Sequence, residues 1–567
     1  MLNSSEHRRA EGERGVTIAL VALLLVPLLA AAALAVDLGG WYARASEIQR
    51  ASDAAALAGV TYLPRGIDKA KTEAARVATR NGYTDGVDDV TVTVTDVGLN
   101  RLRVDITVPG VRQSVSQLFR DDVTVKRSST AEYIQPVPMG SPRNHLGTYR
   151  SPSPAATGIA AADQENFWLS VSGYCARREH GDRITPKTDS NGDPFESCVP
   201  SGGSGASSVV ENPEYGVAGY FYAVEFKEDY TGTAGIEVFD AGHCENSGST
   251  AGDSGTVGGS GVGGRSGQRE YTWTLRSNDS LNPLLATQIG ASVTIGPDDC
   301  GFWSDQWQTL FSVDNPTKGI YFLQIQPVVP ATQSGSEAQE GQNQFSLRIA
   351  DSGVFTPCSS DLNIDPYVAG RNCPNVYGLT HLGVYAQGNG INPSFYLASV
   401  GDEHSGKTMQ IELFDTAEGA ESIQIRDPSG ADYPFTWEVA CMDGSYRSEN
   451  GGSCASATGE VAPPAPGYGP VADVMSLNVS GSSDAFKAWG ARNTQPGRYS
   501  DRLVRLTVRL PGHPLAPNPA LGDISDRWGG LTWWGIAYTV DPVAGVGDRT
   551  TWSINILGDP VRLVPNA

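Results

Sequence analysis

The hydrophobic pattern changes along the chain from an apolar run to a helical stripe and then to alternating strand patterns. Residues 16–36 form an apolar run without a charged side chain, long enough to cross the hydrocarbon core of a bilayer. From residue 34 to residue 61, apolar and small residues recur at steps of three and four, which predicts that the same helix continues as an amphipathic segment. The packing face of this second half, which a partner or the chain itself would cover, carries Trp41, Ala45, Ile48, Ser52 and Ala55.

Shorter elements follow the long helix. The patterns predict a helix over 66–82, paired strands over 90–97 and 101–108, a helix over 111–119 and a strand over 122–134. Strict alternation on both sides of a Gly-Leu-Asn turn is the basis for the paired strands. Together these elements predict a small α+β module packed on the long helix.

Beyond residue 160 the chain alternates short strand patterns with glycine-rich loops. A weak internal repeat aligns FYAVEF…GIEVFDAG (221–242) with FYLASV…QIELFDTAEG (395–419). The same alignment pairs YTWTL (271–275) with FTWEV (435–439), and GIYFLQIQP (319–327) with a stretch at 497–511. Two tandem antiparallel, jelly-roll-like β-sandwiches explain the repeat, and chance similarity between alternating strands is the alternative.

These patterns give a mixed fold class: a transmembrane helix, a small α+β module and two β-sandwiches. The predicted organisation is a cytoplasmic N-terminus (1–14), the helix (15–62), the α+β module (63–134), a linker (135–160), a first sandwich (161–352), a disulfide-containing connector (353–384) and a second sandwich (385–567).

Charge and cysteine usage narrow the compartment and the partners. The net charge of −22 argues against binding nucleic acid through bulk charge. All eight cysteines lie beyond the apolar run, which favours disulfides in an oxidising compartment. The disulfide candidates are Cys175, Cys198, Cys244, Cys300, Cys358, Cys373, Cys441 and Cys454, and their connectivity stays open.

Candidate chemistry is sparse. The seven histidines are scattered, without a metal-binding or catalytic spacing, so the chain is expected not to be an enzyme. Asp189, Asn191 and Asp193 place oxygen ligands at alternating positions around Gly192, a pattern that suits calcium. Pro200 stands where an EF-hand loop has its glutamate, and a plain Asn-Gly turn is the favoured explanation. No other cofactor is indicated.

The N-terminal residues carry a resemblance. The tripeptide ERG (13–15) precedes the apolar run. The motif A-V-D-x-G-x-x-Y (35–42) begins at the end of the run, and Q-x-A-x-D-A-A-A-L-A-G (49–59) lies beyond it. This order resembles TadG-like proteins of the bacterial tight-adherence (Flp) pilus assembly system. The α+β module is correspondingly similar to the globular part of pseudopilin-like (TadE-like) proteins. Leu20 stands where related pilins have a glutamate, so the resemblance implies an uncleaved anchor rather than pilin-style processing after Gly15.

The expected function follows from the anchor and the resemblance. It is that of a single-pass membrane protein of the cell envelope, N-terminus cytoplasmic and bulk extracytoplasmic, which assists assembly of a Tad/Flp-type pilus or related secretion system and contacts its other proteins. The alternative is a cell-surface ligand-binding or adhesion protein with tandem β-sandwiches. A secreted hydrolase with β-domains is a third hypothesis. Separately, the apolar run could belong to a signal peptide cleaved near Val36, which would remove the anchor. A small-molecule ligand stays unassigned.

Overall fold

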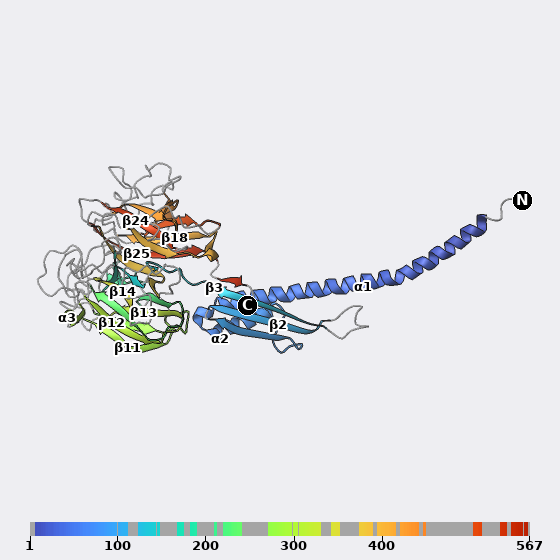
Figure 1. Ribbon diagram of the computed structural model, residues 1–567, viewed down its shortest axis with the longest axis horizontal. Coiled ribbons are helices and arrows are strands. Elements are labelled where there is room, and N and C mark those ends of the chain that lie inside the picture. The colour runs from blue at the N-terminus through green and yellow to red at the C-terminus, as the bar shows by residue number, and fades with distance from the viewer. Residues whose placement is uncertain are drawn as a thin grey trace. The chain divides into compact units, whose positions relative to one another are not determined.

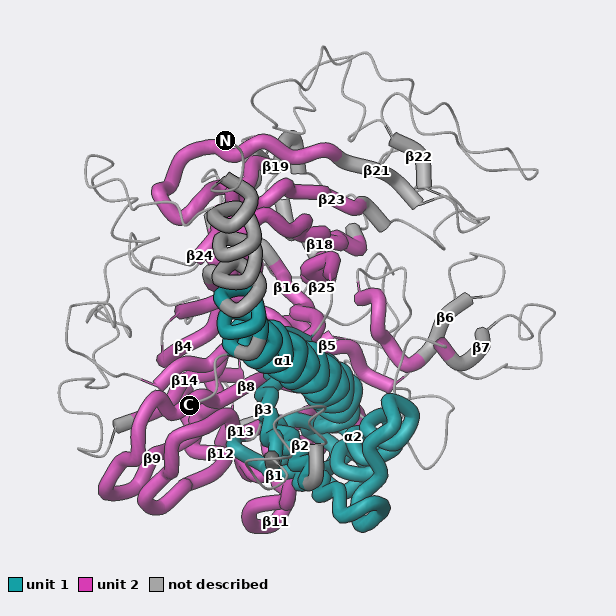
Figure 2. The backbone as a smooth tube through the Cα atoms, turned by 90° about the vertical axis from the view of Figure 1, so that its right-hand side faces the viewer, with its two compact units in different colours: residues 1–135, 280–285, 559–567 teal, residues 136–279, 286–558 magenta. Residues whose placement is uncertain are grey.

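The chain divides into two compact units, coloured separately in Figure 2. The computed structural model describes residues 6–98, 100–111, 123–142, 144–147, 167–174, 182–189, 209–212, 219–240, 270–296, 299–303, 306–329, 342–351, 374–388, 394–415, 420–440, 446–448, 503–512, 533–540, 546–558 and 561–564. The first unit contains Met1–Gln135, Ser280–Leu285 and Asp559–Ala567, and the second contains Pro136–Asp279 and Ala286–Gly558.

The first unit is an α+β module built on one long helix. Its elements are α1 (Glu6–Val60), the 3-10 turn η1 (Leu63–Arg65), α2 (Ile67–Arg80), β1 (Thr91–Gly98), β2 (Arg101–Val111), β3 (Val123–Tyr133) and β26 (Val561–Val564). The predicted second helix, the paired strands and the third strand are confirmed, while the predicted helix over 111–119 lies almost entirely outside the described residues.

The sheet of this module has the strand order β1-β2-β3-β26, and every neighbouring pair is antiparallel. Its fourth strand comes from the end of the chain, which the sequence patterns assigned to the second sandwich. The prediction was wrong here because Val561–Val564 is too short to show periodicity, and its pairing with Tyr133–Thr130 joins residues far apart in sequence.

Helix α1 has two halves with different surroundings. The half nearest the N-terminus extends beyond the rest of its unit (Figure 1). The leucine and valine side chains that the structure describes from Leu20 to Leu38 are at least 50% exposed. The half from Ala45 to Val60 packs on α2, β2 and β3. One helix therefore combines an uncovered apolar segment with a buried face.

The second unit consists of β-sheets. Its strands are β4 (His145–Leu146), β5 (Phe167–Ser172), β6 (Lys187–Asp189), β7 (Val209–Glu211), β8 (Tyr220–Phe226), β9 (Thr233–Asp240), β10 (Tyr271–Arg276), β11 (Gln288–Ile295), β12 (Trp307–Asp314), β13 (Gly319–Pro327), β14 (Gln342–Asp351), β15 (Asn375–Gly378), β16 (His381–Gly388), β17 (Ser394–Ser399), β18 (Thr408–Asp415), β19 (Ala420–Arg426), β20 (Asp432–Tyr433), β21 (Thr436–Ala440), β22 (Tyr446–Ser448), β23 (Leu503–Arg509), β24 (Trp533–Val540) and β25 (Val546–Leu557). Two short helical turns, α3 (Cys300–Trp303) and η7 (Asp402–His404), accompany them.

Two sandwiches share one continuous sheet. Its strand order is β12-β9-β14-β5-β16-β25-β18-β23-β21-β22, with β4 attached to β14, and the antiparallel pair β5–β16 joins the two halves. The opposing layer has two sheets, β11-β10-β13-β8-β15 and β17-β24-β19-β20. The predicted antiparallel β-sandwich fold is confirmed.

The strand orders also confirm an internal repeat and correct its alignment. Outward from the junction, β5, β14, β9 and β12 correspond to β16, β25, β18 and β23, and in the other layer β8, β13, β10 and β11 correspond to β17, β24, β19 and β20. The sequence alignment correctly matches β8 with β17 and β9 with β18. It wrongly pairs YTWTL with FTWEV and GIYFLQIQP with the strand at 503–509, because alternating patterns do not distinguish neighbouring strands.

The core of the second unit is continuous across both sandwiches. At the junction, the Phe167 ring lies 5.0 Å from that of Phe395, and Trp552 lies 5.5 Å from Phe395. The predicted linker is part of this core in its first half. Met139 is fully buried and forms backbone bridges with both Gly378 and Ala398, so this segment connects the two sheets of the second layer.

Candidate functional site in the helix-anchored module

The predicted packing face of α1 lies mostly in the interior of the module. Ile48, Ser52 and Ala55 are fully buried, Ala45 is 7% exposed, and Trp41 is partly buried. The elements that cover the face are α2, β2 and β3 of the same chain. The structure thus brings four of the five predicted residues together against the chain's own sheet and second helix.

Small side chains allow α1 and α2 to approach closely. Ala70, Ala74 and Ala78 of α2 are fully buried beside Ala55, Ala56 and Gly59 of α1. A Cβ atom added at Gly59 would lie 2.6 Å from Leu102 Cδ2 and 2.8 Å from Ala74 Cβ. Gly59 therefore sets the distance between the helices and the sheet, since no side chain fits there.

Polar side chains tie the buried half of α1 to the strands. The Ser52 hydroxyl donates a hydrogen bond to the Val104 carbonyl oxygen at 2.7 Å, so the only polar residue of the predicted face is satisfied in the interior. Gln49 Nε2 donates to Ser129 Oγ on β3 at 2.8 Å and to Asp53 Oδ1 at 2.8 Å. These bonds fix the rotation of α1 over the sheet.

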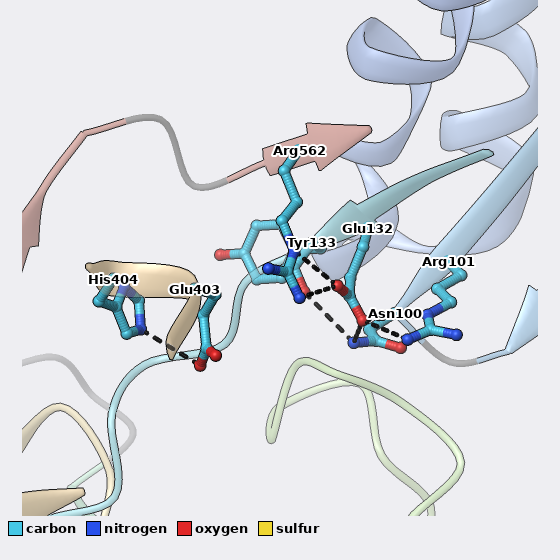
Figure 3. A network of polar contacts seen from close by, with 7 residues as sticks. All are labelled: Asn100, Arg101, Glu132, Tyr133, Glu403, His404 and Arg562. Carbon is cyan, nitrogen blue, oxygen red and sulfur yellow. Dashed lines mark hydrogen bonds and ion pairs between the residues drawn. The ribbon is translucent and has the colours of Figure 1, made fainter. Parts of the chain in front are cut away.

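A second group of polar contacts holds the C-terminal strand on the sheet (Figure 3). Glu132 of β3 accepts hydrogen bonds from Arg101 Nε at 3.0 Å and Nη2 at 2.9 Å. On its other side it accepts from Arg562 Nε at 3.0 Å, and Arg562 Nη2 lies 2.9 Å from the same oxygen. The Glu403–His404 pair drawn in the same figure belongs to the second unit.

The two guanidinium groups decide the charge state of Glu132. Burial of the carboxyl by itself raises its pKa, but the hydrogen bonds and charges of Arg101 and Arg562 outweigh burial, so the pKa lies below its ordinary value. The side chain of Glu132 is 10% exposed, whereas those of Arg101 and Arg562 are 46% and 45% exposed. Glu132 is therefore an ionised, mostly buried carboxylate between three strands.

Sequence reasoning missed this network. Glu132 stands in an alternating strand, and nothing in its spacing points to an arginine 430 positions later. Arg562 carries no motif of its own. Glu132 and Arg562 come together only through the pairing of β3 with β26 in the folded chain.

Few of the other predicted site residues are described. Asp189 ends β6, whereas Asn191 and Asp193 lie outside the described residues, and so do all the candidate cysteines except Cys300, the first residue of α3. Within the ranges that the structure describes, no three acidic, histidine or cysteine side chains form a group that could hold a metal ion. The calcium site and the disulfide pairing stay predictions.

The uncovered half of α1 has the properties of a membrane span. The segment Leu20–Val60 contains a window apolar enough to cross a bilayer, and only 6% of that window is buried inside the protein. A signal sequence near an N-terminus can meet the same criteria, so these properties fit a membrane anchor or a signal sequence and show no orientation.

Comparison with known proteins gives a match at the N-terminal helix of this module. Residues 15–62 match the family profile described as "Putative Flp pilus-assembly TadE/G-like". The matched stretch covers less than a tenth of the chain and contains both the apolar half of α1 and its buried face. A search among curated proteins gives no match to the chain. The N-terminal region is thus TadE/G-like, which confirms the resemblance seen in its motifs.

Proposed function

We propose that this protein is a membrane-anchored, extracytoplasmic structural component that assists assembly of a Tad/Flp-type pilus or a related secretion system. The observation that carries the proposal is the position of the TadE/G-like match on α1. The match covers a helix that is apolar and uncovered in one half and embedded in a folded module in the other. Such a helix supports a folded domain directly at a membrane surface.

The proposal includes an orientation and a non-enzymatic role. Arg8, Arg9 and Arg14 precede the apolar segment, which favours a cytoplasmic N-terminus with the bulk of the chain outside. The acidic sandwiches and the cysteines then face an oxidising, aqueous compartment. The chain acts by binding other assembly proteins rather than by catalysis.

The anchor is tested by charging the uncovered half of α1. Leu24 and Leu28 are 52% and 69% exposed, and arginine at both positions adds about 2.5–3.5 kcal/mol each to membrane insertion. We expect Leu24→Arg/Leu28→Arg to leave the carbonate-resistant membrane fraction, while Tyr42→Arg, at a position 80% exposed beyond the apolar run, stays in it. Equal membrane retention of the two variants would contradict the anchor.

Mass spectrometry of the membrane-bound protein tests processing. The proposal expects the N-terminal residues 2–15 to remain on the mature chain. A mature N-terminus at Val16 would indicate pilin-like cleavage, and one near Val36 would indicate a cleaved signal peptide. The assembly role is tested separately by deleting the gene and imaging pili, whose normal number and length would contradict it.

A further inference from the structure

The C-terminal strand β26 of the first unit follows closely in sequence on a strand of the second unit. Its neighbour in sequence, β25, belongs to the second unit, whereas β26 completes the sheet of the first. Only three residues separate Leu557, the last residue of β25, from Val561. An edge strand joined to another unit by a short connection is an arrangement from which copies of a protein exchange elements.

Most contacts of β26 are with the edge strand β3, and the remainder include contacts with helix α1 of the same unit. Four residue pairs join it to β3, from Val561↔Tyr133 to Val564↔Thr130. Arg562 adds the two-pronged contact with Glu132, and Val561 packs against the core of the module. Leu563 is 43% exposed, so little apolar surface holds the strand. Any copy of the same segment would make the same contacts.

Residues of strand β3 are buried, and its outer backbone groups are paired, when β26 lies beside it. Ala131 is fully buried and Glu132 is 7% exposed with β26 in place. Without β26 the outward backbone N–H and C=O groups of β3 would be unpaired, and such an edge is a template for another extended segment. Glu132 adds specificity, because it selects a strand with arginine at the opposite position.

We propose that the β3 edge is a strand-binding site whose occupant is exchanged between copies, so that Val561–Val564 of one chain pairs with β3 of a second copy. Reciprocal exchange gives a closed dimer, and one-way exchange gives a row of linked copies. Anchoring of both copies in one membrane raises the local concentration of the second copy's Val561–Val564 segment. That step rests on the proposed anchor, but the exchange does not depend on a role in pilus assembly.

Site-specific photo-crosslinking in membranes tests the exchange. Two full-length copies with different affinity tags are co-expressed, each carrying benzoylphenylalanine in place of Leu563. Val97 of β1, on the opposite edge of the sheet and equally 43% exposed, is the matched control position. We expect a crosslinked product that carries both tags and whose linked peptide maps to β3, with at least fivefold less of it from Val97.

Charge variants complete the test. Arg562→Glu should lower the two-tag product at least fivefold, and Arg562→Glu combined with Glu132→Arg should restore it in part. Crosslinks from position 563 to β3 that join only residues of the same polypeptide would overturn the proposal, as would a two-tag product of equal yield from position 97. Membrane fractionation of the same samples shows independently whether the anchor holds.

Discussion

Gly59 illustrates how one residue determines the approach of two helices and a sheet. An added Cβ would lie 3.0 Å from the Ala70 carbonyl oxygen, besides its contacts with Leu102 and Ala74. Gly59→Ala should therefore destabilise the module by about 1–3 kcal/mol, since a fully packed site accepts an extra carbon only by moving its neighbours. The loss of stability is measured by thermal unfolding of the detergent-solubilised chain, with limited proteolysis at sites within residues 45–111 as the readout.

Gly39 is the matched control on the same helix. A Cβ there has no atom within 4 Å among the described residues. Gly39→Ala should leave the module unchanged or slightly more stable, because alanine favours a helix by about 0.5–1 kcal/mol over glycine. If both variants lowered the melting temperature equally, the close packing at Gly59 would not be the cause.

Glu132 makes the attachment of β26 depend on pH. Its folded-state pKa lies below the ordinary value, so its ion pairs stabilise the module above that value and are lost as the pH falls through the folded-state pKa. After correction for the intrinsic pH dependence of amide exchange, the protection of residues 561–564 should fall on acidification below about pH 4, near the ordinary pKa of glutamate. Glu132→Gln should show faster exchange at neutral pH and a weaker pH dependence. Identical profiles for the two proteins would contradict this role.

Local sequence patterns predicted the elements of the module well. The hairpin of β1 and β2 and the helix α2 followed from alternation, turn residues and helical spacing. Of the packing face, Ile48, Ser52 and Ala55 were predictable because a stripe of small and apolar residues on a helix needs a cover. What covers the stripe was left open between a partner and the chain itself, since periodicity gives a face and no neighbour.

Pairing between distant segments was not predictable in the same way. The strand β26 has four residues, and its correct place depends on Glu132 and on the hydrogen-bonding edge of β3. In the sandwiches, β10 corresponds to β19 rather than to the similar sequence of β21, because strand order is decided by packing across the layers. Sequence alternation thus identifies strands without ordering them.

The junction strand β16 carries a histidine that should make the sandwich unit acid-sensitive. Burial, together with the nearby Arg183 charge, lowers the pKa of His381 from 6.5 to about 4. A depressed folded-state pKa contributes stability above pH 6.5 that is lost as the pH falls toward 4, on the order of 3 kcal/mol in total. Urea unfolding at several pH values should show this decline, and His381→Gln, which cannot titrate, should flatten it. An unchanged slope in the variant would exclude His381 as the source.

At the scale of the whole molecule, the chain crosses between its two units more than once. The first unit takes its sheet's last strand from Asp559–Ala567 and a short loop from Ser280–Leu285, and everything between belongs mainly to the sandwiches. The sheet of the first unit is therefore complete only when Val561–Val564 is paired with β3. This arrangement couples the folding of the first and last residues, although the core of each unit is separate.

Removal of the last strand tests that coupling. Deletion of residues 561–567 should lower the stability of the first unit by about 1–3 kcal/mol, because buried Glu132 loses one charged partner and the β3 edge loses its hydrogen bonds. Hydrogen-exchange mass spectrometry should show faster exchange in β3 and in the buried half of α1, while β8, β13 and β18 of the sandwiches keep their protection. Arg562→Gln, which keeps the strand but removes the charge, should give a smaller change of the same kind. Faster exchange spread equally over both units would show that the C-terminal strand stabilises the chain as a whole rather than the first unit.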